Sequence, residues 1–254
     1  MPLSAPFLKR LTLLPERIDR EAFPFSRLAW LEDDFQISLT APITILAGEN
    51  GSGKSTLLEA IAGLCGFSAY GGNQHHRLLH TGDANPLREA LRAAWLPKVT
   101  HGFFFRAESF FNLANYIDEE GDKDYWGGKK LLDQSHGESF LATFESKFKS
   151  RKPSIYILDE PEAALSPQRM RRFLRMMDHW QNASHVQAII ATHSPIIMGM
   201  PGADLRLINA EGIAPCRLRD VPHFREMQDF FADPESYYDE AINTPLPEDE
   251  DGED

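Results

Sequence analysis

The 254-residue chain carries 26 basic and 38 acidic side chains, a formal net charge of −12, and 42% hydrophobic residues. This composition is typical of a globular protein, and the length fits one large domain or two small ones. The acidic balance excludes a general attraction to a phosphate backbone, although local basic patches leave direct nucleic-acid binding open. Two cysteines exclude a disulfide framework. No apolar run approaches the ~18 residues that span a bilayer, so we expect a cytoplasmic protein without membrane insertion.

The first half of the chain predicts strands that lead into a helix. Residues 7–47 have the pattern of short strands and turns, and the continuously apolar "ITILA" at 43–47 indicates a strand buried on both faces. A helix is predicted over 54–67, a further helical piece over 86–95 and a strand over 102–105. Residues 109–120 predict another helix.

The second half alternates strands with helices. Strands are predicted over 154–160 and 186–194, with a helix over 166–180 between them. Two shorter strands follow near 204–209 and 212–218, and the aromatic-rich stretch 224–242 predicts a helix pair packed on the domain. Such alternation predicts a mainly parallel α/β sheet.

The segment "GENGSGKST" matches the phosphate-binding pattern G-x-x-x-x-G-K-[ST]. It follows an apolar strand and opens a helix, which is the context that this motif requires. Its glycines let backbone N–H groups converge on an anion, and the helix N-terminus adds a partial positive charge. We expect Lys54 to reach the β- and γ-phosphates of ATP and Ser55 to bind Mg²⁺. The predicted nucleotide-binding residues of this motif are Gly48, Glu49, Asn50, Gly51, Ser52, Gly53, Lys54, Ser55 and Thr56.

Two more apolar strands end in polar residues with chemistry suited to ATP hydrolysis. The run "IYILDE" ends in Asp159 and Glu160, and "QAIIATHS" contains His193. Asp159 is placed to hold Mg²⁺ together with Ser55, and Glu160 to polarise a water for attack on the γ-phosphate. Ligands bind at the carboxyl edge of a parallel sheet, so His193 is expected at the same edge, where it can hydrogen-bond the γ-phosphate or the water. Glu160 and His193 are therefore the predicted catalytic residues.

A second turn, "SHGES", lies 81 residues after Lys54. Ser135 offers a hydroxyl, Gly137 permits close approach of the backbone, and a predicted helix begins directly afterwards. The same letters also fit a helix capping box, with Ser135 as the N-cap and Glu138 three residues later. The two interpretations are compatible.

In order and spacing, these motifs resemble the ATP-binding-cassette (ABC) type ATPases over about residues 25–200. The resemblance implies a P-loop NTPase of ABC type, with a mainly parallel sheet, an N-terminal antiparallel β part and a helical signature subdomain. It implies one domain over 1–244, with the lid and signature turn at about 66–145. The acidic composition of residues 245–254 predicts a disordered tail.

The resemblance also implies a site shared between two copies of the chain. In that family the signature turn caps the γ-phosphate bound to the other subunit, so that two ATP molecules are sandwiched in a head-to-tail homodimer. Ser135, Gly137 and Glu138 would then bind ATP from the second copy.

Several positions depart from the family pattern or stay open. His136 stands where the family usually has glycine. The glutamine expected after the "GFFF" strand is missing, and either Arg106 or Glu108 stands in its place. The aromatic residue that stacks on adenine is also open, since Phe25 and Trp30 could equally be part of the core.

The residues of these motifs, and the lack of heptad repeats between the phosphate-binding loop and the "SHGES" turn, resemble those of stand-alone soluble ATPases related to the SMC and recombination-repair branch. Three functions stay open. The first is an ATP-dependent homodimeric switch in DNA maintenance or defence, acting on an effector protein that the sequence does not identify. The second is the nucleotide-binding subunit of a membrane transporter. The third is a non-hydrolysing ATP-gated module, against which Glu160 and His193 argue.

Overall fold

The computed structural model describes residues 4–68, 71–72, 85–108 and 152–244. The signature turn, the helix predicted over 109–120, most of the predicted lid and the acidic tail lie outside these residues. Within them the strands form two sheets, one of order β5-β6-β7-β3-β8-β9 and one of order β2-β1-β4.

The larger sheet is parallel except at one edge. Its strands are β5 (Gly102–Arg106), β6 (Ser154–Asp159), β7 (Val186–Ala191), β3 (Ile43–Gly48), β8 (Asp204–Asn209) and β9 (Gly212–Pro215). Among the strands that the structure describes in this sheet, β9 alone runs antiparallel to its neighbour. Every residue of β6 and β7 is buried, because helices cover both faces of the sheet, and this burial explains their unbroken apolar runs. The predicted mainly parallel sheet is confirmed.

The smaller sheet is antiparallel and consists of β2 (Gln36–Ser38), β1 (Leu8–Leu13) and β4 (Leu91–Trp95). It confirms the predicted N-terminal β part. The helix predicted over 86–95 is wrong in its second half, because α2 (Pro86–Ala90) ends where Leu91 pairs with Leu13 of β1. The open edge of β1 supplies backbone partners that override the helix propensity of this segment.

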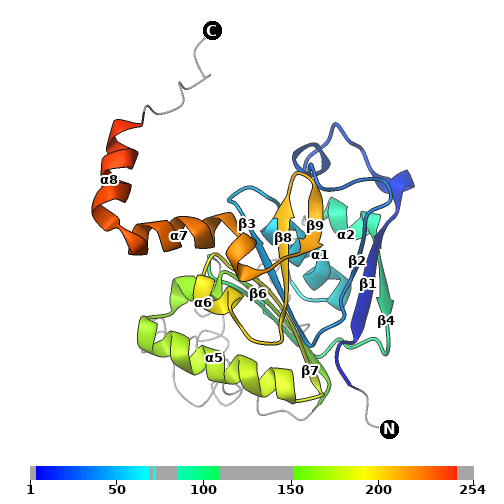
Figure 1. The fold of residues 1–254 in the computed structure, drawn as a ribbon. Helices are drawn as coiled ribbons and strands as arrows, with labels where there is room; N and C mark the ends of the chain where they lie inside the picture. Colours follow the sequence, from blue (N-terminus) through cyan, green and yellow to red (C-terminus); the bar gives the residue numbers. More distant parts are fainter. Residues whose placement is uncertain (1–3, 69–70, 73–84, 109–151, 245–254) are drawn as a thin grey trace, which may run out of the picture.

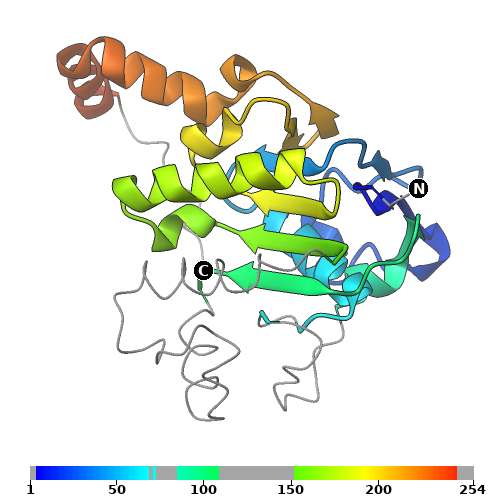
Figure 2. The same ribbon diagram turned by 90° about the horizontal axis from the view of Figure 1, so that it is seen from below.

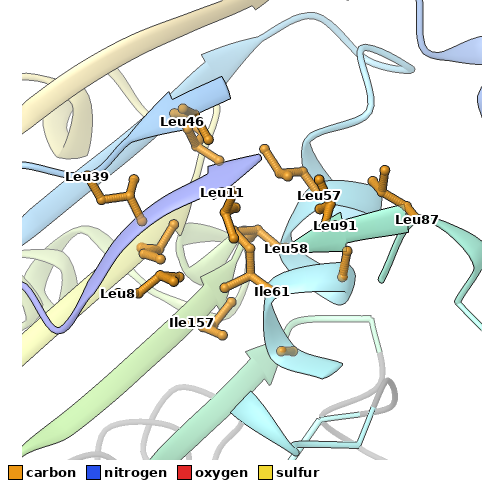
Figure 3. Close-up of a cluster of buried hydrophobic side chains, with 14 of the residues drawn as sticks. Leu8, Leu11, Leu39, Leu46, Leu57, Leu58, Ile61, Leu87, Leu91 and Ile157 are labelled. Atoms are coloured by element: carbon orange, nitrogen blue, oxygen red, sulfur yellow. The ribbon is translucent and has the colours of Figure 1, made fainter. Parts of the chain in front are cut away.

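Helix α1 (Lys54–Cys65) packs between the two sheets. Its Leu57, Leu58 and Ile61 meet Leu11 of β1 and Ile157 of β6 in one apolar cluster (Figure 3). On the opposite face of the larger sheet lie α5 (Pro167–Asn182) and α6 (Pro195–Met198) (Figure 1 and Figure 2). Short 3₁₀ turns complete these layers: η1 (Pro15–Arg17), η2 (Phe25–Arg27), η4 (Pro161–Ala164) and η5 (Leu218–Asp220).

One buried side chain joins the two sheets. Gln187 on β7 is fully buried. Its Oε1 accepts hydrogen bonds from the backbone N–H groups of Phe7 at 2.8 Å and Leu8 at 2.9 Å, and its Nε2 donates to the carbonyl of Leu8 at 3.0 Å. A buried polar group that loses its partner costs ~1–3 kcal/mol, so these bonds hold the start of β1 against the larger sheet.

The C-terminal helices α7 (Pro222–Ala232) and α8 (Pro234–Asn243) form the predicted pair, but they project from the body (Figure 1). Phe224 in the first turn of α7 packs on the core, and neither helix has a buried residue. The prediction that the pair packs on the domain is confirmed for the first turn of α7 alone, and farther along Phe230 contacts Tyr237 and Tyr238 within the pair. None of the helices in the described ranges has the length and apolarity needed to cross a bilayer.

Candidate functional site

Those of the predicted site residues that the structure describes gather at one edge of the larger sheet. β3 leads into the phosphate loop, β6 ends at Asp159, and β7 ends two residues before His193. These three strands are neighbours, so their carboxyl ends meet at this edge. A cavity of about 870 Å³ opens there, and Glu49, Ser52, Glu160 and His193 are among its lining residues.

The phosphate loop requires glycine at its tightest positions. Gly51 and Gly53 have φ values of 76° and 88°, a region that other residues rarely adopt. A Cβ atom at Gly53 would also lie 2.5 Å from Leu28 Cδ2 and 3.0 Å from Trp30 Nε1. The loop passes directly into α1, whose first residue is Lys54, so the N-terminus of this helix lies at the loop.

The side chain of Lys54 folds back across the loop. Its Nζ donates to the carbonyl oxygens of Gly48 and Glu49, both at 2.8 Å. Burial lowers the pKa of Lys54, while the negative charges of Glu160 and Asp159 oppose that shift. A buried ammonium group therefore lies within the turn where the sequence predicts phosphate binding.

The two predicted metal ligands are in direct contact. Ser55 Oγ donates to Asp159 Oδ1 at 3.2 Å. Asp159 is 4% exposed, and burial raises its pKa to about 6 against the effects of the Ser55 hydrogen bond and the Arg106 charge. Mg²⁺ prefers oxygen ligands and takes one or two from the protein, the rest from water and substrate phosphates. This donor pair fits Mg²⁺, and the described ranges hold no cluster of three or more His, Cys, Asp or Glu side chains suited to a metal.

The predicted catalytic pair lies beside the loop. Glu160 has a φ of 49°, a left-handed conformation that costs on the order of 1–3 kcal/mol in a residue other than glycine. Its Oε1 lies 3.7 Å from His193 Nε2, an atom that has no hydrogen-bond partner among the described residues. Burial and the charge of Lys54 lower the pKa of His193, so its imidazole is neutral at pH 7. A carboxylate and a neutral imidazole thus face the same cavity.

Glu162 was not identified from the sequence as a site residue. Its Oε1 accepts hydrogen bonds from the backbone N–H groups of His193 at 2.6 Å and Ser194 at 3.2 Å. Burial raises the pKa of Glu162, and its hydrogen bonds with the Thr192 side chain and with the backbone N–H of His193 oppose that effect. The carboxylate therefore holds the segment that carries His193 against the turn that follows Glu160. The sequence did offer one signal for Glu162, which is its position in "DEPEAALS", two residues after Glu160.

The aromatic residues around the loop differ in exposure. Phe25 and Trp30 are 6% and 3% exposed and belong to the core, although Trp30 also lines the larger cavity, and its Nε1 supports the loop by donating to the Ser52 carbonyl at 2.7 Å. Phe23, which was not singled out from the sequence, is 76% exposed. It lines a second cavity of about 390 Å³ next to the loop, together with Arg27, Gly53 and Thr56 among others.

Arg106 and Glu108, the two candidates for the missing glutamine, differ in position. Arg106 is in register with Asp159 on the neighbouring strand, and its Nε lies 3.9 Å from Asp159 Oδ2. The side chain of Glu108 is 80% exposed and contacts Arg106. Arg106 is therefore the one that lies against the predicted metal ligands.

Ser135, Gly137 and Glu138 lie outside the described residues, as does His136. Their predicted contact with ATP on a second copy stays a prediction.

Two family models match the chain around these residues. One, described as "AAA domain, putative AbiEii toxin, Type IV TA system", matches residues 139–199, and another, described as "AAA domain", matches 25–88. Over 177 residues the chain is 30% identical to the cytochrome c biogenesis ATP-binding export protein CcmA of Mesorhizobium japonicum. That alignment covers 64% of this chain and 83% of the relative.

Two solved structures are similar to the chain at lower sequence identity. An ATP-binding cassette of an ABC transporter is 19% identical, with a TM-score of 0.46 over 92% of this chain and 99% of that one. The SMC head domain from Thermotoga maritima is 18% identical, with a TM-score of 0.45 over 84% of this chain and 100% of that one.

Proposed function

This chain belongs to the ABC-type ATPases, and on that premise we propose that it binds and hydrolyses ATP to drive the opening and closing of a homodimer. The observation that carries the proposal is the meeting of three groups at one sheet edge. They are the Lys54 ammonium, the Ser55–Asp159 oxygen pair and the Glu160–His193 pair.

The first step of the proposed cycle is phosphate binding. The β- and γ-phosphates lie in the loop, and Lys54 exchanges the carbonyls of Gly48 and Glu49 for phosphate oxygens. Ser55 and Asp159 would hold Mg²⁺, which would neutralise charge on the phosphate oxygens when bound. The N-terminus of α1 stabilises the same negative charge.

The second step is attack by water on the γ-phosphorus. Glu160 orients the water and accepts its proton while the new P–O bond forms and the bond to the bridging oxygen breaks. His193, held through its backbone by Glu162, donates a hydrogen bond to the γ-phosphate or the water. The products are ADP and inorganic phosphate.

The third step depends on a second copy of the chain. Ser135, Gly137 and Glu138 of one copy cap the γ-phosphate held by the other, and hydrolysis removes the anion that both copies share. We place this switch in the cytoplasm, as a stand-alone ATPase related to the SMC branch that acts on an effector protein. Defence is the role best supported, because one matched family description names a "putative AbiEii toxin".

A second candidate function is the nucleotide-binding subunit of a membrane transporter. The similarity to an ATP-binding export protein favours it. The replacement of the expected glutamine by Arg106 argues against it, because in transporter members of the family this segment normally couples to the membrane protein. Co-purification with a membrane protein, and turnover that rises on reconstitution with it, would select this alternative.

Mixing two inactive variants tests the shared site. Lys54→Ala and Gly137→Asp are each expected to abolish turnover, because each damages both sites of its own homodimer. In a mixed head-to-tail dimer one site combines an intact loop with an intact turn. Random pairing is therefore expected to restore about a quarter of the wild-type phosphate release.

The matched control for this experiment mixes Lys54→Ala with Glu160→Gln. Lys54 and Glu160 line the same cavity, so in the proposed dimer both belong to one copy at each site. Every site in that mixture then lacks a required group, and no turnover is expected. Equal rescue in both mixtures, or none in either while the wild type is active, would contradict a site shared in this way.

Phe23 is proposed to stack on the adenine, since it is the exposed aromatic residue beside the loop. Stacking on an aromatic side chain contributes ~1–3 kcal/mol per base, so Phe23→Ala is expected to weaken ATP binding by roughly tenfold or more. Phe23→Trp should retain affinity, and Leu96→Ala, an exposed apolar residue elsewhere, should have no effect. Isothermal titration calorimetry with ATP measures the change. An undiminished affinity in Phe23→Ala would remove this residue from the site.

A further inference from the structure

Arg106 bridges three carboxylates next to the predicted Mg²⁺ ligands. Its guanidinium lies 2.5 Å from Glu59 Oε1, 3.0 Å from Glu108 Oε2 and 3.9 Å from Asp159 Oδ2. The other oxygen of Asp159, Oδ1, is the one that accepts from Ser55. The two oxygens of this carboxylate therefore face different partners, a hydroxyl and a cation.

The position of Arg106 is fixed by two elements of the site itself. Parallel pairing of β5 with β6 puts Arg106 in register with Asp159. Glu59 lies four residues after Ser55 on α1, so both side chains stand on the same face of the helix. The side chains of Arg106 and Glu59 are each about one quarter exposed, which leaves their ion pair only partly screened by water.

Arg106 is the cation that lies against the metal-facing carboxylate. Lys54, the other cation close by, is engaged with the carbonyls of Gly48 and Glu49. A divalent cation bound at Ser55 and Asp159 would therefore sit close to a fixed positive charge. Like charges repel each other even in water. For a divalent cation and a guanidinium ~6 Å apart in water, the repulsion energy corresponds to about a tenfold change in metal affinity.

We propose that Arg106 makes binding of Mg²⁺ depend on the triphosphate. Its guanidinium lies at ion-pair distance from one oxygen of Asp159 and repels a second cation, so the oxygen pair alone binds the metal weakly. The negative charge of bound ATP offsets Arg106, and the metal then binds tightly together with the nucleotide. Arg106 is a positioning residue in this scheme, which rests on the proposed function of the same site.

The test measures metal binding without nucleotide and uses Mn²⁺ alone as the probe. Electron paramagnetic resonance follows the loss of the free Mn²⁺ signal as full-length protein is added. Arg106→Gln is expected to bind Mn²⁺ about tenfold more tightly than the wild type. Arg106→Lys keeps the charge and should bind Mn²⁺ as weakly as the wild type. Arg106→Met, which keeps the aliphatic stem, serves as a second neutral variant if Arg106→Gln does not fold.

The matched control is Arg88→Gln, which makes the same change in net charge at an exposed ion pair with Glu89. It is expected to leave Mn²⁺ binding unchanged. Equal Mn²⁺ affinity in the wild type and in folded Arg106→Gln or Arg106→Met would overturn the inference, and so would weaker binding in either variant. Circular dichroism and thermal melting of the same samples report the folded state.

A parallel titration with a fluorescent ATP analogue, in the presence of Mg²⁺, separates this inference from the proposed function. If the wild type binds the nucleotide and the neutral variants bind Mn²⁺ no more tightly than the wild type, the role of Arg106 is refuted and the proposed function is not. A gain of Mn²⁺ affinity in a chain that binds no nucleotide refutes the proposed function and leaves Arg106 as the residue that weakens a metal site.

Discussion

Replacement of Glu160 by glutamine is expected to lower ATP turnover by ~10²–10⁴-fold while leaving ATP binding intact, because an amide cannot accept the proton of the attacking water. The residue is well placed for that change, since its strained backbone directs the carboxylate toward His193 and the cavity. The γ-phosphate then stays in place, so the variant should accumulate as an ATP-bound dimer. Phosphate release and size-exclusion chromatography with light scattering measure the two effects.

Glu211→Gln provides the control for Glu160→Gln. It makes the same chemical change on an exposed turn next to β9, and it should turn over ATP and elute as the wild type does. A Glu160→Gln variant that stays monomeric at saturating ATP would contradict the switch, and one with undiminished turnover would assign the catalytic base to another group.

Replacement of Lys54 by alanine is expected to weaken ATP binding by roughly 10²-fold or more. A hydrogen bond to a charged group contributes ~1.5–3 kcal/mol, and Lys54 can make two such bonds, as its present contacts with the loop carbonyls show. The fold should survive, because Gly48 and Glu49 line a cavity open to water that can satisfy their carbonyls. Fluorescence titration with an ATP analogue measures the loss.

Lys98→Ala, at an exposed lysine between the sheets' edge strands β4 and β5, is the matched control and should bind ATP normally. Wild-type affinity in Lys54→Ala would mean that the loop at residues 48–56 is not the phosphate site, and the proposed function would fall with it.

Features of the fold encoded by local patterns were predictable from the sequence. The strands around Ile43–Gly48, Ser154–Asp159 and Val186–Ala191 are continuous apolar runs because both of their faces are buried. The tight turn that leads into α1 was predictable for a similar reason, because Gly51 and Gly53 adopt positive φ values that other residues rarely adopt. Strand β4 was missed because its pairing partner β1 lies far away in the sequence. The helix propensity of residues 86–95 does not indicate that pairing.

The finer assignments at the site depend on tertiary packing. The sequence could not show that Phe23 is exposed while Phe25 and Trp30 are buried, since all three lie in one irregular segment. The choice between Arg106 and Glu108 required the register of β5 against β6. These residues were decided by contacts between elements, which a single sequence without a repeating pattern does not encode.

The buried Gln187 connects the strand that precedes Phe23 with the strand that precedes His193. The segment that carries Phe23 follows β1, the segment that carries His193 follows β7, and Gln187 fastens those two strands together. Sliding of one sheet over the other would break three buried hydrogen bonds at once, so we expect the two sheets to move as one rigid body. Residues that close over a bound nucleotide must then come from another region of the chain or from a neighbouring copy.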